Sequence, residues 1–304
     1  MKQSFQISDR AVTACEEGKG PIVVYVNPDD RERRFLTEEL QIDDHTLASA
    51  LDPDELSRIE FGPQYTAIIY KRPRNYSSDQ QLLFGVASTG LFMFPDRLRI
   101  IVGEEFSPFD GGPRQPIDSL PGVMLRLMAR AVVHFREHLR AINRVSDEIQ
   151  GEINRSMENK HLIGMFSLEK SLVYYVSALQ SNGALLEKLR HGAVKIGFSH
   201  DELDILDDLI IDNNQLARQS EMSSNILASL MDARASIVAN NINVLMKRLN
   251  VITIAIMVPT LVVSAFSMNV PIPMQDRPWM FYFVHLIALL SAVVFLYLWK
   301  RLSG

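Results

Sequence analysis

Cysteine is almost missing from this 304-residue chain, since Cys15 is the only one. A single cysteine excludes an intramolecular disulfide, a CxxC redox pair and a zinc ribbon, and it is consistent with a cytosolic setting. The chain also lacks an excess of basic residues, because 31 Lys and Arg stand against 36 Asp and Glu. This balance argues against a nucleic-acid-binding protein, which normally carries a basic domain or stripe.

Catalytic signatures are missing as well. The sequence contains no glycine-rich phosphate loop, no GxSxG elbow, no HExxH pair and no recognisable nucleophile–base pair. Residues 1–17 have no apolar core, so we do not expect a signal peptide. The sequence therefore predicts a protein that is not an enzyme.

Charge is absent from two long stretches near the C-terminal end. No charged residue occurs over 249–275 or over 278–299. As a helix, residues 279–299 would be about 31 Å long, enough to cross a hydrocarbon core of about 30 Å. Tryptophan and tyrosine lie near both ends of this stretch, as in an aromatic belt. We expect two transmembrane helices, over about 249–267 and about 279–299, rather than a pair of buried core helices.

The connection between the two spans is short, which predicts a helical hairpin with both of its ends on one side of the membrane. Lys247 and Arg248 precede the first span, and Lys300 and Arg301 follow the second. The positive-inside rule then places both chain termini in the cytoplasm. We expect a multi-pass protein of the inner (plasma) membrane.

The rest of the chain divides into a mixed α/β part and a helical part. Runs rich in β-forming residues lie between turn residues at Pro21–Asn27, Thr66–Arg72, Gln81–Thr89, Leu91–Phe94 and Arg97–Gly103. Asp29–Leu40 and Asp43–Leu51 begin with acids and are expected to be helical. We expect an α/β cytosolic domain over 1–120, a helical stalk over 121–248 and a transmembrane hairpin over 249–304. One helix is predicted from about Asp201 to near Phe266, roughly 100 Å long, which requires a bundle or an oligomer.

A polar stripe runs along the first span and the residues just before it. Its members alternate at three- and four-residue spacing and therefore share one helix face: Asn243, Met246, Asn250, Thr253, Met257, Thr260 and Ser264. Lipid cannot satisfy such groups, so the polar stripe either joins two membrane helices or lines a pore enclosed by several copies of the chain. The absence of a carboxylate suits a hydrated cation such as Mg²⁺. Pro259 is expected to free a backbone carbonyl toward the polar stripe.

Two other groups have more than one interpretation. Six acids fall within twelve residues: Asp201, Glu202, Asp204, Asp207, Asp208 and Asp212. They form either a solvated helix start that favours the helix dipole or a low-affinity divalent-cation site completed by a neighbouring subunit. His134 and His138 are four residues apart and can both face a zinc ion, but no third ligand is evident. Packing or surface positions are therefore the favoured interpretation for them, as for His191 and His200.

Several landmarks together resemble the CorA family of divalent metal-ion transporters over essentially the whole chain. In order they are ALDPDELSRIEF (50–61), the long helix, NVLMKRLNVIT (243–253), Pro259, SMNVPIPMQ (267–275) and two closing membrane helices. The family's Gly-Met-Asn triplet reads Ser267-Met268-Asn269 here. The resemblance implies a CorA-like homopentameric funnel whose first membrane helices line one axial pore.

The resemblance also implies roles for individual residues. Asn269, with Ser267 and Met268, would form the outer mouth and bind the hydrated cation. Asn243 would form the inner constriction, with Met246 and Met257 as hydrophobic narrowings. Acids between neighbouring subunits would sense cytosolic divalent cations, with Asp232 and Asp208 on the long helix and Glu104 and Glu105 as candidate partners from the α/β domain.

The implied function is a transporter or channel for Mg²⁺, or for Co²⁺ or Ni²⁺, with the divalent cation as both substrate and regulator. Two alternatives stay open. One keeps the fold and is a Zn²⁺ transporter of the ZntB type, with or without proton coupling. The other, motivated by serine in place of glycine in the triplet, is a membrane-anchored sensor or scaffold that has lost transport. The expected partners are other copies of the chain, membrane lipids and divalent ions, and no nucleic acid.

Overall fold

The computed structural model describes residues 1–16, 18–74, 82–105, 107–109, 117–155, 159–268 and 277–303. Its internal contacts divide the chain into two units, Met1–Met231 and Asp232–Gly304. The boundary between the units falls inside one long helix, α6 (His200–Phe266).

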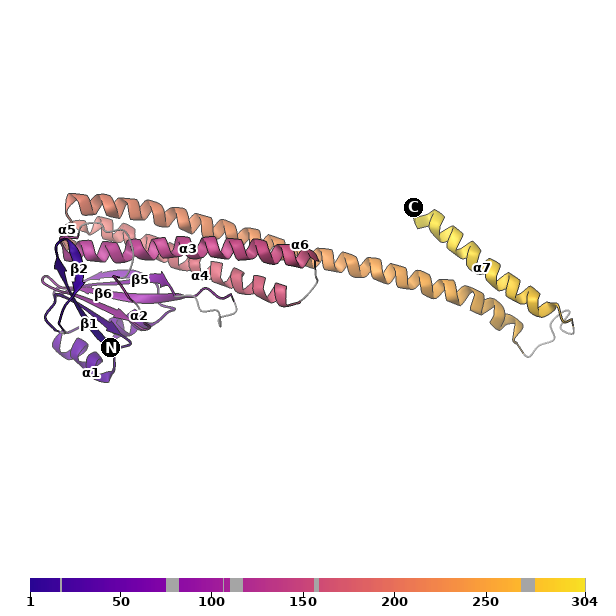
Figure 1. The fold of residues 1–304 in the computed structure, drawn as a ribbon, viewed down its shortest axis with the longest axis horizontal. Helices are drawn as coiled ribbons and strands as arrows, with labels where there is room; N and C mark the ends of the chain where they lie inside the picture. The colour runs from indigo at the N-terminus through magenta and orange to yellow at the C-terminus, as the bar shows by residue number, and fades with distance from the viewer. Residues whose placement is uncertain are drawn as a thin grey trace. The chain divides into compact units, whose positions relative to one another are not determined.

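A seven-stranded sheet forms the centre of the first unit, with the strand order β2-β1-β3-β7-β6-β5-β4 (Figure 1). The strands are β1 (Lys2–Ser8), β2 (Ala11–Ala14), β3 (Ile22–Val26), β4 (Arg58–Phe61), β5 (Thr66–Pro73), β6 (Val86–Met93) and β7 (Leu98–Val102). Neighbouring strands are antiparallel, except that β3 and β7 run parallel. Along β3, Ile22, Val24 and Val26 face one hydrophobic core while Val23 and Tyr25 face another, because side chains alternate across a strand.

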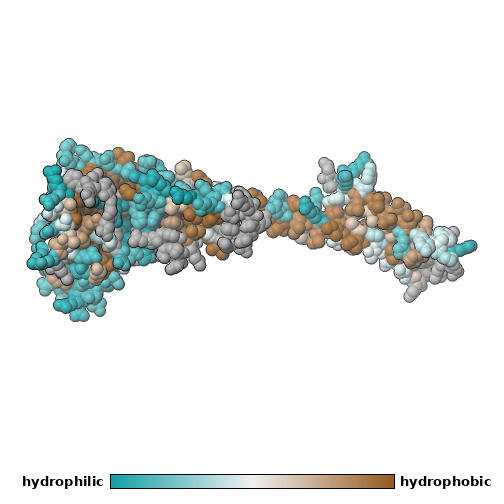
Figure 2. All heavy atoms as spheres, viewed as in Figure 1, coloured by the Kyte–Doolittle hydropathy of each residue, from teal (hydrophilic) through white to brown (hydrophobic). Residues whose placement is uncertain are grey.

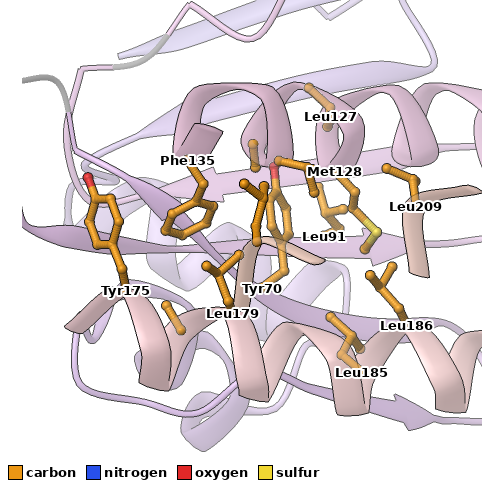
Figure 3. Close-up of a cluster of buried hydrophobic side chains, with 14 of the residues drawn as sticks. Tyr70, Leu91, Leu127, Met128, Phe135, Tyr175, Leu179, Leu185, Leu186 and Leu209 are labelled. Carbon is orange, nitrogen blue, oxygen red and sulfur yellow. The ribbon is translucent and has the colours of Figure 1, made fainter. Parts of the chain in front are cut away.

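Helices cover both faces of this sheet. The smaller layer holds α1 (Asp30–Arg34), the π-helical turn η1 (Phe35–Glu39) and α2 (Asp44–Leu51). The larger layer holds α3 (Leu120–Arg155), α4 (Asn159–His191), the short α5 (Ala193–Ile196) and the first part of α6. Figure 3 shows how Tyr70 and Leu91 of the sheet meet Phe135 of α3 and Leu179 of α4 in the larger core.

The second unit contains the end of α6 and the whole of α7 (Met280–Ser303). Both helices contain a window long and apolar enough to cross a membrane, and those windows are 0% and 6% buried in the single chain. The surface of this hairpin is accordingly dominated by hydrophobic residues (Figure 2). The expected continuous helix to Phe266 is confirmed, and the second apolar helix continues a few residues beyond the expected 279–299.

The expected mixed α/β domain, long helix and apolar C-terminal helix are thus confirmed, with local differences. The end of the run at 81–89 and most of the run at 91–94 form a single strand, β6 (Val86–Met93), which passes through Gly90. The helix expected over 29–40 is split between α1 and the turn η1. Strands β1, β2 and β4 were not expected from the sequence pattern.

Candidate cation pathway and sensor residues

The end of α6 has a covered face and an open face. Its half-buried residues recur every three or four positions, at Val251, Ala255, Val258, Pro259, Val262 and Phe266. At about 100° per residue, this face is centred about 170° from the polar stripe. All seven residues of the polar stripe are exposed in the single chain.

Helix α7 is the other helix of the second unit, so we assign the covered face of α6 to its packing against α7. Its own less exposed residues also share one side: Met280, Val284, Ile287, Ala288, Ser291, Ala292, Phe295 and Trp299. At the end opposite the connecting loop, Lys247 Nζ lies 5.5 Å from the centre of the Trp299 ring. The polar stripe therefore does not join the two membrane helices of one chain, which was one of the two interpretations that the sequence left open.

The two threonine hydroxyl groups in the polar stripe are oriented by the helix itself. Thr253 Oγ1 donates to the Leu249 carbonyl at 2.9 Å, and Thr260 Oγ1 donates to the Ile256 carbonyl at 2.6 Å. Because each hydroxyl proton is used within α6, the oxygen offers only lone pairs to its surroundings. At these two positions the polar stripe thus presents hydrogen-bond acceptors without negative charge.

The methionines and the proline of this segment occupy different faces. Met246 and Met257 are 50% and 62% exposed and interrupt the polar stripe with apolar side chains. Pro259 has no N–H, so the carbonyl of Ala255 lacks its usual helical donor. Both Pro259 and Ala255 lie on the covered face. The freed carbonyl therefore lies on the far side of α6, and the expectation that it faces the polar stripe was wrong.

The predicted outer mouth is described only in part. Ser267 and Met268 are exposed directly after the last residue of α6, and Ser267 Oγ donates to the Val263 carbonyl at 3.0 Å. Asn269, the predicted cation-binding residue, lies outside the described residues. Its role stays a prediction.

Of the predicted partner acids in the α/β domain, Glu104 is already engaged. Its carboxylate lies 3.1 Å from Arg72 Nη2 and 2.7 Å from Arg74 Nε. Burial lowers the pKa of Arg72, and the charge of Glu104 opposes that shift. A cation at Glu104 would compete with two guanidinium groups, whereas Glu105 is exposed.

The acidic cluster at the start of α6 has members of two kinds. Asp207 pairs with Arg190 at 2.6 Å and Asp212 pairs with Arg136 at 2.7 Å, so these two tie α6 to α4 and α3. Glu202 forms a capping box with Ser199, which satisfies the helix start. The remaining acids are exposed and share one helix face: Asp201, Asp204 and Asp208.

Asp208 makes no ion pair with any residue in the described part of the first unit, and Asp232 is exposed at the start of the second unit. Across the described ranges, no three or more His, Cys, Asp or Glu side chains converge in a way that could hold a metal ion. Any cation site built from Asp208 or Asp232 therefore needs ligands that one chain does not bring together.

Two of the histidines are organised by a tyrosine that no sequence pattern singles out. His134 Nε2 lies 3.0 Å from His138 Nε2, and His138 Nδ1 lies 2.5 Å from the hydroxyl of Tyr175 on α4. Burial lowers the pKa of both histidines, that of His138 to about 4. In contrast, His191 is exposed and pairs with the Glu187 carbonyl within its own helix.

Comparisons with known proteins point to one family. A family model described as "CorA-like Mg2+ transporter protein" matches residues 22–301. The curated "Cobalt/magnesium transport protein CorA" of Methanocaldococcus jannaschii is 24% identical over 286 residues, which cover 90% of this chain and 88% of that protein.

Solved structures show the same fold at low sequence identity. The complete CorA magnesium transporter of M. jannaschii superposes with a TM-score of 0.82 at 20% identity, covering 100% of this chain and 98% of that one. The full-length CmaX protein gives a TM-score of 0.73 at 14% identity, over 100% and 97%. The cytoplasmic domain of ZntB from Vibrio parahaemolyticus gives 0.60 at 11% identity, over 79% and 98%.

Proposed function

The chain belongs to the CorA-like Mg²⁺ transporter family, and from this premise we propose that it conducts divalent cations through a pore lined by the polar stripe of α6. In this proposal the end of α6 and all of α7 are its two transmembrane helices. Membership of a transporter family also agrees with the expectation that the protein is not an enzyme.

The observation that carries the proposal is the open face of α6. The polar stripe is exposed and uncharged, its two threonine hydroxyls present acceptors, and it lies opposite the half-buried face of α6. Lipid cannot satisfy such a surface, so in a membrane it faces water or other copies of the chain. One stripe cannot enclose a channel, and a closed ring of copies places the same stripe around a common axis. The family resemblance supplies the number of copies, five.

The chemistry of the polar stripe favours an ion that keeps its water. Mg²⁺ dehydrates reluctantly, and its bound waters are hydrogen-bond donors. Thr253 and Thr260 offer lone pairs to such waters because their protons are already used by α6. Asn243 is proposed as the inner constriction, Met246 and Met257 as apolar narrowings, and Asn269 as the outer capture residue.

Permeation is proposed to be passive and controlled from the cytosol. A membrane potential supplies about 4.6 kcal/mol per 100 mV for an ion of charge 2+ moving inward. Asp208 and Asp232 are proposed to bind cytosolic divalent cations together with acids of a neighbouring subunit. Without the cation, like charges repel and separate the subunits; with it, they are held together and the pore closes. Glu105 suits the partner role better than Glu104, which two arginines already neutralise.

Ion-by-ion flux into liposomes tests the proposal. The purified protein is reconstituted, and uptake of Mg²⁺, Co²⁺, Ni²⁺ and Zn²⁺ is compared with protein-free vesicles, with and without a pH gradient. We expect Mg²⁺ uptake that follows the membrane potential and needs no pH gradient. Zn²⁺ uptake driven by a pH gradient would instead support the ZntB-type alternative. Intact pentamers with no flux for any ion would support the sensor or scaffold alternative.

A further inference from the structure

The pair His134 and His138 has the geometry of two metal ligands. They lie four residues apart on α3, their Nε2 atoms are 3.0 Å apart, and their rings meet at 68°. An ion 2.0–2.1 Å from both atoms would see them at an angle of about 94°, between the octahedral and the tetrahedral values. Two histidines at this spacing on one helix face are a recurring metal-binding arrangement.

The hydroxyl of Tyr175 decides which ring nitrogen of His138 is available. If Tyr175 donates to Nδ1, His138 carries its proton on Nε2 and donates it to His134, so a proton bridges the pair. If His138 Nδ1–H donates to Tyr175 and His134 also carries its proton on Nδ1, both Nε2 lone pairs are free to bind one cation. Metal-ligating histidines usually donate their other N–H to a neighbouring group, and the 2.5 Å contact supplies that neighbour.

The surroundings hold these rings in place. Tyr175 projects from α4 beside Phe135 of α3, as Figure 3 shows, with the two rings edge to face at 5.0 Å. Phe84 packs its ring against His138 at 5.2 Å. Preorganised ligands lose little conformational entropy when an ion binds.

The donor set selects a class of ion. Imidazole nitrogen suits Zn²⁺, Co²⁺ and Ni²⁺, whereas Mg²⁺ prefers oxygen. The negative charge of Glu137 favours a cation at His134, whereas the positive charges of Arg72 and Arg130 disfavour it. The charge of Arg72 is balanced by its ion pair with Glu104. Two protein nitrogens leave further coordination positions for water, which predicts an exchangeable ion rather than a permanent structural one.

We propose that His134 and His138 bind a transition-metal ion of the Zn²⁺, Co²⁺ or Ni²⁺ class, with Tyr175 as the positioning residue. The site lies within the first unit, whereas the polar stripe lies in the second. It links α3, which carries the ligands, to α4, which carries their orienting hydroxyl. The proposal does not depend on which ion the pore conducts.

Cobalt spectroscopy on the purified full-length protein tests this site directly. The protein is stripped with chelator and titrated with Co²⁺ in excess Mg²⁺, which occupies oxygen-ligand sites. The visible absorption of Co²⁺ reports nitrogen ligation. We expect one saturable nitrogen-ligated Co²⁺ per chain, displaced by Zn²⁺. Its absence from the wild-type protein would overturn the proposal in favour of the bridging proton.

Variants separate the ligands from their support. His134→Ala and His138→Ala should each weaken Co²⁺ binding at least tenfold, whereas His191→Ala, the exposed histidine of α4, should leave it unchanged. Tyr175→Phe keeps both ligands and should weaken binding by about 10- to 100-fold, the usual effect of losing an orienting partner. Melting temperature and oligomer size confirm folding, and Tyr175→Phe still tests the site if an alanine variant misfolds. Unchanged Co²⁺ binding in folded His138→Ala, or in folded Tyr175→Phe, would contradict the assignment.

Discussion

A single oxygen atom distinguishes Thr260 from the apolar residues around it. Because Thr260 Oγ1 donates to Ile256 in its own helix, its contribution to a pore is acceptance of hydrogen bonds from water. Thr260→Val removes that acceptor and keeps the β-branched shape. At about 1 kcal/mol per net hydrogen bond, the loss corresponds to about fivefold for one subunit, and it is repeated in every copy.

We therefore expect Thr260→Val to lower Mg²⁺ flux in liposomes at least severalfold, with unchanged oligomer size. Thr260→Ser is the matched control because it retains the hydroxyl group, and it should stay close to wild type. If the valine variant transports Mg²⁺ at the wild-type rate, Thr260 does not line the pathway.

The buried side-chain amide of Asn182 makes the two backbone hydrogen bonds that a neighbouring strand would make to β5. The pairing of β4 with β5 stops at Arg58 opposite Ile69. Two residues later, the N–H of Lys71 donates to Asn182 Oδ1 and the Lys71 carbonyl accepts from Asn182 Nδ2, both at 2.9 Å. The amide of α4 thus continues the ladder where β4 ends and fastens the helix to the sheet.

Asn182→Leu should strongly destabilise the first unit, since it leaves both polar groups of Lys71 buried without partners. At about 1–3 kcal/mol for each of the two orphaned groups, we expect a loss of about 2–6 kcal/mol. The measurement is the melting temperature in detergent, with an expected decrease of at least about 4 °C. Gln180→Ala, at an exposed position of the same helix, is the control and should change the melting temperature little. A melting temperature within a degree of wild type would show that the bridge adds no stability.

At the scale of elements, the sequence predicted the features that follow from periodic residue spacing. It did not predict the features that depend on contacts between residues far apart in the chain. The long helix follows from fifty residues without Pro or Gly, and the polar stripe follows from its spacing alone. Strands β2 and β4 are only four residues long and largely exposed, so they are too short to show a pattern of alternation. Residue spacing does not encode tertiary packing. It therefore could not predict which face of α6 is covered by α7, or that Tyr175 contacts His138.

Gly90 explains why the sequence pattern indicates two strands where the structure has one, β6. A Cβ atom at this position would lie 2.5 Å from the Cβ atom of Ala50 in α2, so the glycine allows the helix to rest directly on β6. In the sequence, the same glycine interrupts an apolar run and was interpreted as a break. Its role is close packing within a continuous strand.

Gly90→Ala should therefore destabilise the packing of α2 on the sheet. Overpacking of this kind costs about 1–3 kcal/mol, which predicts a lower melting temperature and faster proteolysis within 44–51. Gly103→Ala is the control, because a Cβ atom there meets its nearest neighbour at an ordinary 3.5 Å. Equal stability of the two variants would show that α2 has room to shift.

At the scale of the whole molecule, the single chain leaves much apolar surface uncovered on α6. Outside the membrane segment, Ile211, Met222 and Ile226 are 62%, 58% and 55% exposed. Scattered apolar residues are normal on a surface, but here they accompany an open polar stripe on the same helix. Self-association accounts for both features. Symmetric copies of the chain would bury the exposed apolar residues of α6 and enclose the polar stripe.

We predict a homopentamer in mild detergent and in lipid. Native mass spectrometry of the full-length protein should give five times the mass of one chain, 34.4 kDa. Met222→Glu places a charge on the exposed apolar surface of α6 and should reduce the pentamer fraction, whereas Glu221→Gln next to it should not. A stable monomer or dimer as the main wild-type species would refute the pore proposal together with the pentamer.

The proposed regulation by cytosolic Mg²⁺ also depends on the assembly, because no single chain gathers a complete cation site within its described residues. Asp232 and Asp208 are exposed acids of α6, available to a neighbouring subunit. Asp232→Ala removes one carboxylate from each copy, which weakens cation binding and lowers the repulsion that opens the assembly. We expect inhibition of flux to require a severalfold higher Mg²⁺ concentration, with pentamer content unchanged.

Asp212→Asn is the matched control, since Arg136 already neutralises this acid at 2.7 Å. Flux is measured against internal Mg²⁺ in parallel for wild type and both variants, with protease protection as a second readout. If the Mg²⁺ dependence of Asp232→Ala coincides with that of wild type in both readouts, Asp232 is not part of the sensor.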